Sequence, residues 1–209
     1  MTGCKLNSIA KSTKNIVNKQ IDLGKTEGNI YKNSFFNMTV TIPKDWVIAS
    51  DADRQKIIDQ GKAAIAGEDK TKQAQLKLSE LRTVYLLLIS KNGLSDQSAD
   101  NPNYILMAEK LSLLQNIKKS SSYLQSVKTQ LLALKDSIPY TFNKEIYSEK
   151  VGKRDFSVLE ASMDLGTTKM TQKYYTTITN GYALSFITTS TNTDGDNVLN
   201  DIIKKISLK

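Results

Sequence analysis

The chain of 209 residues contains no histidine and a single cysteine, Cys4. Without histidine it lacks the side chain most often used as a general base or metal ligand, so every catalytic triad built on histidine is excluded. One cysteine forms neither an intrachain disulfide nor a cysteine-rich metal cluster. No run of about 18 apolar residues occurs, so no transmembrane helix is predicted. The sequence therefore predicts a non-catalytic protein without metal or cofactor.

The motifs of the common enzyme classes are missing as well. No Gly-x-Ser-x-Gly elbow, phosphate-binding P-loop, dinucleotide fingerprint or zinc-peptidase motif occurs. Ser8 and Lys11 match a Ser-x-x-Lys pattern, but they lie in a polar segment without a scaffold. Residues 192–197 resemble a calcium loop, yet such a loop would start at Ser190 and end at Asp201, and both are the wrong residue types. An enzyme that uses only Asp, Glu, Lys or Tyr stays open as an alternative.

Lysine and arginine outnumber the acids by 29 to 21, which gives a formal net charge of +8. A basic balance favours polyanions such as anionic lipids and cell-wall polymers. Nucleic-acid binders concentrate their charge, whereas these lysines are spread along the chain. The one acid-poor stretch, residues 110–135, is typical of a solvated helix face. The predicted partners are therefore the membrane, an envelope protein or an anionic wall polymer, and not nucleic acid.

The first residues resemble the end of a bacterial lipobox. Thr2-Gly3-Cys4 matches the positions where a signal peptidase cuts before a cysteine that is then acylated. A chain trimmed at that point, without the apolar part of its signal peptide, would start in this way. The polar, lysine-rich residues that follow are typical of a solvated tether. The sequence predicts a lipidated N-terminus and tether over residues 1–28, on the extracellular face of the cell membrane; the alternative is an ordinary free cysteine.

Residues 30–34 and 36–42 have the alternating pattern of a half-buried strand pair, which ends at Pro43. Ser50 is a suitable N-cap for a helix that ends near Gly67 and precedes a second helix over residues 69–79. The pattern then predicts a central strand, an exposed loop, a further strand and an amphipathic helix. These are residues 84–89, 91–103, 104–111 and 120–135.

The last third predicts a four-strand antiparallel meander and a closing amphipathic helix. Asn180-Gly181 is the strongest hairpin signal, because both residues tolerate the positive φ of a type I′ turn. The order of elements indicates one α+β domain over residues 29–209, in which helices cover a mostly antiparallel sheet. The strands are expected at residues 140–149, 154–164, 168–179 and 182–190, and the helix at 198–206.

A candidate binding surface consists of Trp46, Lys173, Tyr174, Tyr175 and Tyr182, because aromatic rings beside a lysine suit an anionic or sugar partner. The alternative is that these aromatic side chains are buried in the core. Trp46 follows a strand end, where a single tryptophan is typical of the core. The two adjacent tyrosines point to opposite faces of a strand, so at least one is expected to pack under a helix.

Two stretches resemble PsbP-like domains: residues 31–46, where a strand pair runs into Pro43 and Trp46, and the hairpin 172–187 with its closing helix. The resemblance implies an α/β/α sandwich around an antiparallel sheet, and a role in binding other macromolecules. Lipoproteins of Gram-positive bacteria share this layout. The helical insertion at about 50–80 and the lipobox-like start depart from the plant proteins. The predicted function is a surface-exposed lipoprotein binding module; the alternative is a small-ligand receptor with a pocket between sheet and helices.

Overall fold

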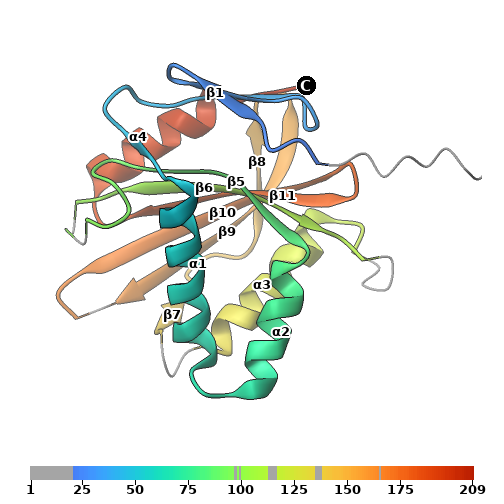
Figure 1. Ribbon diagram of the computed structural model, residues 1–209, viewed down its shortest axis with the longest axis vertical. Coiled ribbons are helices and arrows are strands. Elements are labelled where there is room, and N and C mark those ends of the chain that lie inside the picture. The colour runs from blue at the N-terminus through green and yellow to red at the C-terminus, as the bar shows by residue number, and fades with distance from the viewer. Residues whose placement is uncertain (1–20, 97, 99, 113–116, 135–137, 165) are drawn as a thin grey trace, which may run out of the picture.

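The computed structural model describes residues 21–96, 98, 100–112, 117–134, 138–164 and 166–209. In this part of the chain an eight-stranded antiparallel sheet carries helix α4 and a four-stranded sheet on one face, and α1, α2 and α3 on the side of the other (Figure 1). The larger sheet has the order β4-β5-β6-β11-β10-β9-β7, and β8 pairs with β9; the smaller has the order β1-β2-β3-β12. The elements are β1 (Lys25–Glu27), β2 (Ile30–Asn33), β3 (Met38–Thr41), β4 (Val47–Ile48), α1 (Asp51–Ala66), α2 (Lys70–Glu80), β5 (Thr83–Ser90), β6 (Asn103–Lys110), α3 (Ser120–Leu132), β7 (Tyr140–Thr141), β8 (Tyr147–Val151), β9 (Arg154–Asp164), β10 (Lys169–Thr179), β11 (Tyr182–Ser190), α4 (Thr193–Lys204) and β12 (Ser207–Leu208).

The main core lies between the two sheets and under α4. Met38 and Val40 of β3 are buried, while the threonines between and after them are half-buried, which is the two-residue period of a strand with one covered face. They join a cluster that includes Phe186 of the larger sheet and Leu199 and Ile202 of α4. Each of these side chains is less than 5% exposed. Burial of this apolar surface at about 25 cal/mol per Å² holds the layers together.

A second cluster lies on the opposite face of the larger sheet. Tyr123 and Leu124 of α3 pack there against Leu159, Tyr174 and Ala183. The 3.6-residue period that predicts this helix therefore corresponds to a real contact stripe. Within the described ranges, no helix combines the length and apolarity needed to cross a membrane.

The predicted α+β fold is confirmed, and so are its helices. Ser50 caps α1, since its hydroxyl accepts a hydrogen bond from the Asp53 N–H at 3.1 Å. Asn192 caps α4 in the same way through the Gly195 N–H at 2.8 Å, so the segment that resembles a calcium loop begins a helix. Asn180 and Gly181 have φ values of +53° and +80°, as the type I′ hairpin requires.

The strand predictions need three corrections. Residues 84–89, predicted as a central strand, belong to β5, which has only the two-residue strand β4 outside it. Residues 140–149 form two strands rather than one, because β7 and β8 pair with different parts of β9 and the register shifts between them. The residues between the two strands include Phe142 and Ile146, which pack against the cluster under α3. The N-terminal strand pair belongs to a separate four-stranded sheet, which the two-residue strand β12 completes by pairing with β3.

The folded domain also starts earlier than the predicted boundary at residue 29. Strand β1 lies within the segment assigned to the tether and pairs with β2. Asp22 accepts hydrogen bonds through its carboxylate from Gly24 at 2.9 Å and from the Ser34 N–H at 3.0 Å. These bonds lower the pKa of Asp22, with the Gly24 bond as the larger cause. The part of the domain held by hydrogen bonds therefore reaches back to Asp22.

Two buried tyrosine hydroxyls are expected to affect stability in opposite directions. Tyr104 is fully buried, and its hydroxyl has no hydrogen-bond partner among the described residues. The Tyr31 hydroxyl donates to the Leu23 carbonyl at 2.7 Å and accepts from Asn33 at 3.1 Å. Because an unpaired buried hydroxyl is destabilising, Tyr104→Phe should raise the free energy of unfolding by about 1 kcal/mol, and Tyr31→Phe should lower it by about 1–2 kcal/mol. Urea unfolding measures both; equal losses in the two variants would contradict this account of Tyr104.

Candidate functional site

The structure does not bring the predicted binding residues together on one surface. Tyr175 is 2% exposed and lies in the main core, whereas Tyr174 is 9% exposed and packs with the cluster under α3 on the opposite face. Trp46 and Tyr182 are half-buried against the main core. The apolar surface of these rings is therefore largely used in packing within the domain. The expectation that at least one of the two adjacent tyrosines packs under a helix is confirmed, since Tyr174 packs against α3.

Lys173 is half-buried on β10, between Gln172 and Tyr174 in the chain, and lies opposite Thr188 of β11 and Glu160 of β9. It lies on the same strand as Tyr174 and Tyr175 but does not join them in a shared surface, because the two rings face opposite layers. Cys4, the predicted lipidation site, lies outside the described residues.

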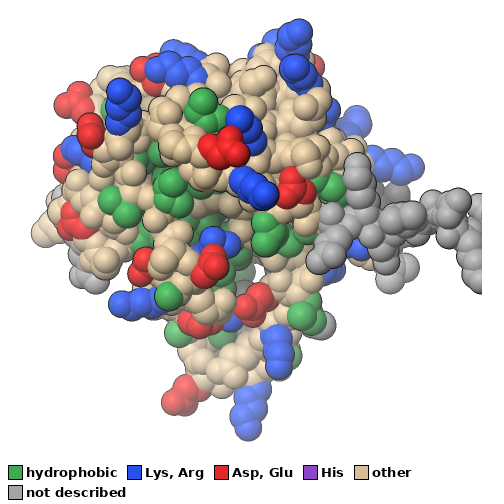
Figure 2. All heavy atoms as spheres, turned by 45° about the horizontal axis from the view of Figure 1, so that its top comes forward, with side chains coloured by type: hydrophobic (Ala, Val, Ile, Leu, Met, Phe, Trp, Pro, Cys, Tyr) green, Lys and Arg blue, Asp and Glu red, His purple; other side chains and the backbone are tan. Residues whose placement is uncertain are grey.

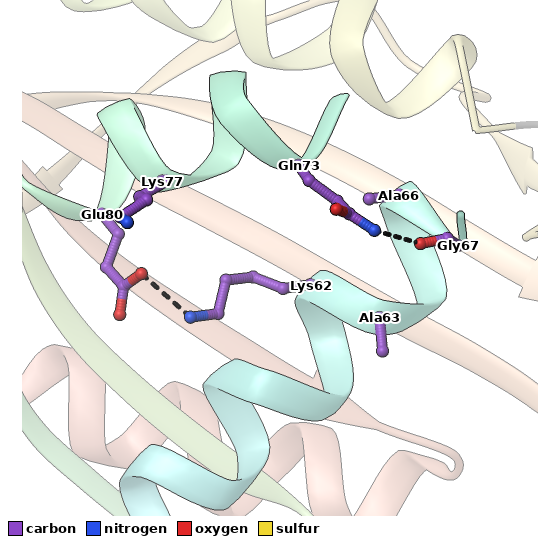
Figure 3. A pocket seen from close by; sticks show the side chains of 7 residues that line it. All are labelled: Lys62, Ala63, Ala66, Gly67, Gln73, Lys77 and Glu80. Carbon is purple, nitrogen blue, oxygen red and sulfur yellow. Dashed lines mark hydrogen bonds and ion pairs between the residues drawn. The ribbon is translucent and has the colours of Figure 1, made fainter. Parts of the chain in front are cut away.

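A cleft of about 380 Å³ lies between α1 and α2, in the helical insertion (Figure 3). The sequence analysis placed both helices but assigned no function to the space between them. The two helices reverse direction at Gly67, whose φ of +49° is unfavourable for a residue with a side chain. Gln73 secures the turn from the second helix, because its amide donates to the Gly67 carbonyl at 2.7 Å. The cleft is lined by Lys62, Ala63, Ala66, Gly67, Gln73, Lys77 and Glu80.

An ion-pair network crosses this cleft. The Lys62 ammonium lies 2.8 Å from Asp59 on its own helix. It also lies 2.9 Å from Glu80 on α2, the contact drawn in Figure 3. The bond to Asp59, followed by the bond to Glu80, raises the pKa of Lys62. The same contact with Lys62, with a smaller contribution from Gln55, lowers the pKa of Asp59. Lys62 is thereby kept protonated, which makes it a fixed cation and a poor base or nucleophile.

Two tyrosines lie near carboxylates, the half-buried Tyr85 of β5 near Glu80 and the buried Tyr123 of α3 beside Glu109. Burial is the main cause that raises the pKa of Tyr85, and the negative charge of Glu80 raises it further. The Tyr123 hydroxyl donates to Glu109 at 2.7 Å, and burial of Tyr123, reinforced by that carboxylate, raises its pKa strongly. These phenols stay protonated at neutral pH, so they serve as hydrogen-bond donors and not as general bases.

The cleft is therefore suited to binding rather than to acid–base chemistry. Lys77 is exposed at the cleft wall and offers a cation, and Glu80 offers an acceptor. Among the described residues, no cluster of three or more acids or cysteines is placed to hold a metal ion. Sequence spacing did not predict the cleft, since Lys62 and Glu80 meet only after the chain reverses at Gly67.

Two smaller cavities of about 280 and 250 Å³ lie elsewhere on the surface. The first is lined by apolar residues that include Ile105 and Met170 and by polar residues that include Asn101 and Thr189. The second lies beside the outer strand β5 and includes Arg54. Neither of them, nor the cleft, is lined by Trp46 or by the three tyrosines of the candidate surface.

Charged side chains of both signs are interspersed over the face shown in Figure 2, with apolar side chains between them. Of the lysines in the acid-poor stretch, Lys118 and Lys119 are exposed just before α3, and Lys128 lies over the Phe142 ring, 5.3 Å from its centre. The two exposed lysines agree with the solvated face expected for residues 110–135.

Comparison with protein-family models and with curated proteins finds no match. Solved structures with a similar fold include LpqN of Mycobacterium tuberculosis, described as involved in cell envelope biogenesis, at 15% identity and a TM-score of 0.46 over 83% of each chain. A protein of Bacteroides thetaiotaomicron is 14% identical, with a TM-score of 0.42, over 82% of this chain but only 45% of that chain. Cyanobacterial PsbP (CyanoP) from Synechocystis sp. PCC 6803 is 9% identical, with a TM-score of 0.50, over 89% of this chain and 96% of that chain. The last of these similarities identifies the architecture of this chain as a PsbP-like fold.

Proposed function

We propose that the protein is a lipid-anchored, non-catalytic binding module on the extracellular face of a bacterial cell membrane. The observation that carries this proposal is Thr2-Gly3-Cys4, followed by a polar segment that reaches the domain at Asp22. A diacylated cysteine holds a protein at a membrane durably, where one acyl chain is marginal. Lys5, Lys11 and Lys14 beside the anchor add attraction to anionic headgroups, on the order of 1 kcal/mol each.

The length of the segment supports a role away from the membrane surface. Residues 5–21 separate Cys4 from Asp22, the first residue tied to the domain by its hydrogen bonds. At roughly 3.4 Å per residue, such a segment has a maximum reach of about 60 Å. The domain would then contact wall polymers or other envelope components rather than lipid.

The described geometry favours a surface that binds a polymer over a buried small-ligand pocket. Three cavities lined by described residues measure about 380, 280 and 250 Å³, near or below the lower end of the roughly 300–1,000 Å³ of small-molecule sites. The space between the sheet and α3 is occupied by Tyr123, Leu124 and their partners. An anionic wall polymer fits the cleft between α1 and α2, where Lys77 is exposed and Gln73 lies beside it.

Lipidation is tested by expressing the full-length gene in a Gram-positive host, beside a Cys4→Ser variant. The wild-type protein should gain the mass of its acyl chains at Cys4 and appear in the membrane fraction. The variant should keep its peptide mass and leave the membrane, because the acceptor thiol is gone. Intact-mass spectrometry and fractionation measure both properties. An unmodified thiol together with the same distribution in both proteins would refute the anchor.

The cleft is tested with a purified poly(glycerol phosphate) polymer as the probe. Lys77→Ala should weaken binding about three- to five-fold, since an exposed charge pair contributes up to about 1 kcal/mol. Lys70→Ala is the matched control, because it removes an exposed lysine from the same helix but not from the cleft. Titration calorimetry at low salt gives the affinities. Equal losses in both variants would indicate attraction to net charge alone, and an inert wild-type protein would exclude this polymer.

A further inference from the structure

The cavity of about 280 Å³ lies on the face of the larger sheet that α3 covers in part. Ile187 packs against the cluster under α3, and its cross-strand partner Ile105 lines the cavity. Residues directly opposite each other in a sheet have their side chains on the same face. Ile57 of α1 and Leu94 of the loop between β5 and β6 also line the cavity. The cavity is thus bounded by the sheet, a helix and a loop.

Two neighbouring rows of side chains on this face differ in polarity. One row holds Leu88 and Ile105, which lie opposite each other on β5 and β6. Two residues further along the same strands, Ser90 lies opposite Asn103, and Thr189 of β11 continues this second row. Side chains two residues apart on a strand share a face at a spacing of about 7 Å. All of these residues except Ser90 line the cavity, so a ligand that spans both rows needs an aliphatic part and a polar end.

The polar row is only partly paired within the protein. The Gln172 amide donates to the Thr189 hydroxyl at 3.1 Å. Ser90, by contrast, is fully buried, and its hydroxyl has no hydrogen-bond partner among the described residues. Asn103 lies directly opposite Ser90 but does not bond to it. Because buried polar groups are normally paired, this row has hydrogen-bonding capacity that the fold itself does not use.

Asp96 is the only charged side chain among the described residues that line the cavity. Its carboxylate accepts hydrogen bonds from the Ser98 N–H and from the Ser98 hydroxyl, both at 2.9 Å. These bonds lower the pKa of Asp96, with the backbone bond as the larger cause, so the carboxylate is ionised at neutral pH. Lys91 of the same loop pairs with Asp100 and does not line the cavity. The cavity therefore offers a negative charge beside apolar side chains.

The loop that carries Asp96 is held in place by its own side chains. The Asn101 carboxamide accepts a hydrogen bond from the Asn92 N–H at 3.0 Å. It also donates to the carbonyls of Gly93 and Asp96, at 2.8 Å each. A site that is formed before its ligand arrives avoids part of the entropic cost of binding.

We propose that this cavity binds the ammonium end of an unbranched aliphatic chain, as in an alkylamine or a lysine side chain. The aliphatic part packs over Leu88 and Ile105, and the ammonium donates hydrogen bonds to the Asp96 carboxylate and the Asn103 side-chain carbonyl. An anionic end group is disfavoured, because no cation among the described lining residues would offset its charge. This site is separate from the lipid anchor and from the cleft between α1 and α2, so the proposal does not depend on either.

The first test compares n-hexylammonium with 1-hexanol, its neutral counterpart, on the full chain. Backbone amide shifts in NMR titrations give both the affinity and the location of binding. Hexylammonium should bind with a dissociation constant on the order of 1 mM, as expected for so few atoms, and shift the amides of Leu94, Asp96 and Asn103. Hexanol should bind about ten-fold more weakly, because a charged hydrogen bond is lost. n-Butylammonium should also bind about ten-fold more weakly, because two buried methylenes are missing.

Matched variants assign the charge. Asp96→Asn should abolish the preference for hexylammonium and leave hexanol binding unchanged, because asparagine keeps an acceptor for the Ser98 N–H but carries no charge. Asp194→Asn should retain the preference, since Asp194 is an exposed acid at the start of α4 that does not line the cavity. Thermal unfolding checks that both variants fold. If Asp96→Asn does not fold, the three probes still test the proposal on the unaltered protein.

N-acetyl-lysine amide distinguishes the two sources of this chemistry. Shifts at the same positions would support a lysine side chain carried by a partner peptide, whereas binding of hexylammonium alone would support a free amine. The proposal is overturned if hexanol binds as tightly as hexylammonium, or if the shifts lie on another surface. It is also overturned if Asp194→Asn reduces the preference as much as Asp96→Asn does, since the effect would then reflect net charge.

Discussion

Two consecutive side chains of β10, Tyr174 and Tyr175, are buried on opposite faces of the larger sheet. A strand with both faces apolar is stable only if each face is covered, because successive side chains point in opposite directions. Helix α3 covers one face, and α4 with the smaller sheet covers the other (Figure 1). Most polar groups enclosed between such layers pair with one another, as Thr176 and Ser185 do at 2.8 Å, and the Tyr104 hydroxyl is an exception. The three-layer arrangement follows from this double burial.

The same packing explains why the cavities lie at the periphery. The centre of the sheet is filled by side chains from both layers, so the described space for a ligand occurs where a layer ends. The cleft between α1 and α2 belongs to the helical insertion, and the cavity beside β5 lies where β4 stops pairing. Residues of the cleft lie outside both core clusters, whereas Tyr31, Leu86 and Leu87 beside β5 belong to the main core. Surface residues of the helical insertion therefore change with little loss of stability.

Local patterns in the sequence predicted the elements well and their assembly less well. Residues at strand and helix periods, the Ser50 cap and the Asn180-Gly181 turn depend on neighbours close in sequence. The separate smaller sheet depends on the two-residue strand β12 reaching β3, and so short a strand has no periodic signal. Gly152 shows how tight this approach is, since a Cβ there would lie 3.1 Å from the Ile206 carbonyl. The Lys62–Glu80 contact is equally long-range, so the cleft was not foreseen.

The cationic side chains of the cleft and of the sheet edge differ in how their charge is held. Lys62 lies between two carboxylates, so the cleft gains positive potential mainly from the exposed Lys77, where dissolved salt screens the attraction. A repeating polyanion compensates for such weak contacts by making many of them. Arg54 is held by one exposed counter-ion, Asp51 at 2.7 Å, and by the Tyr85 carbonyl at 3.3 Å, which ties its charge to the edge of the larger sheet. The fold therefore fixes the positions of Lys62 and Arg54, whereas Lys77 stays in contact with solvent.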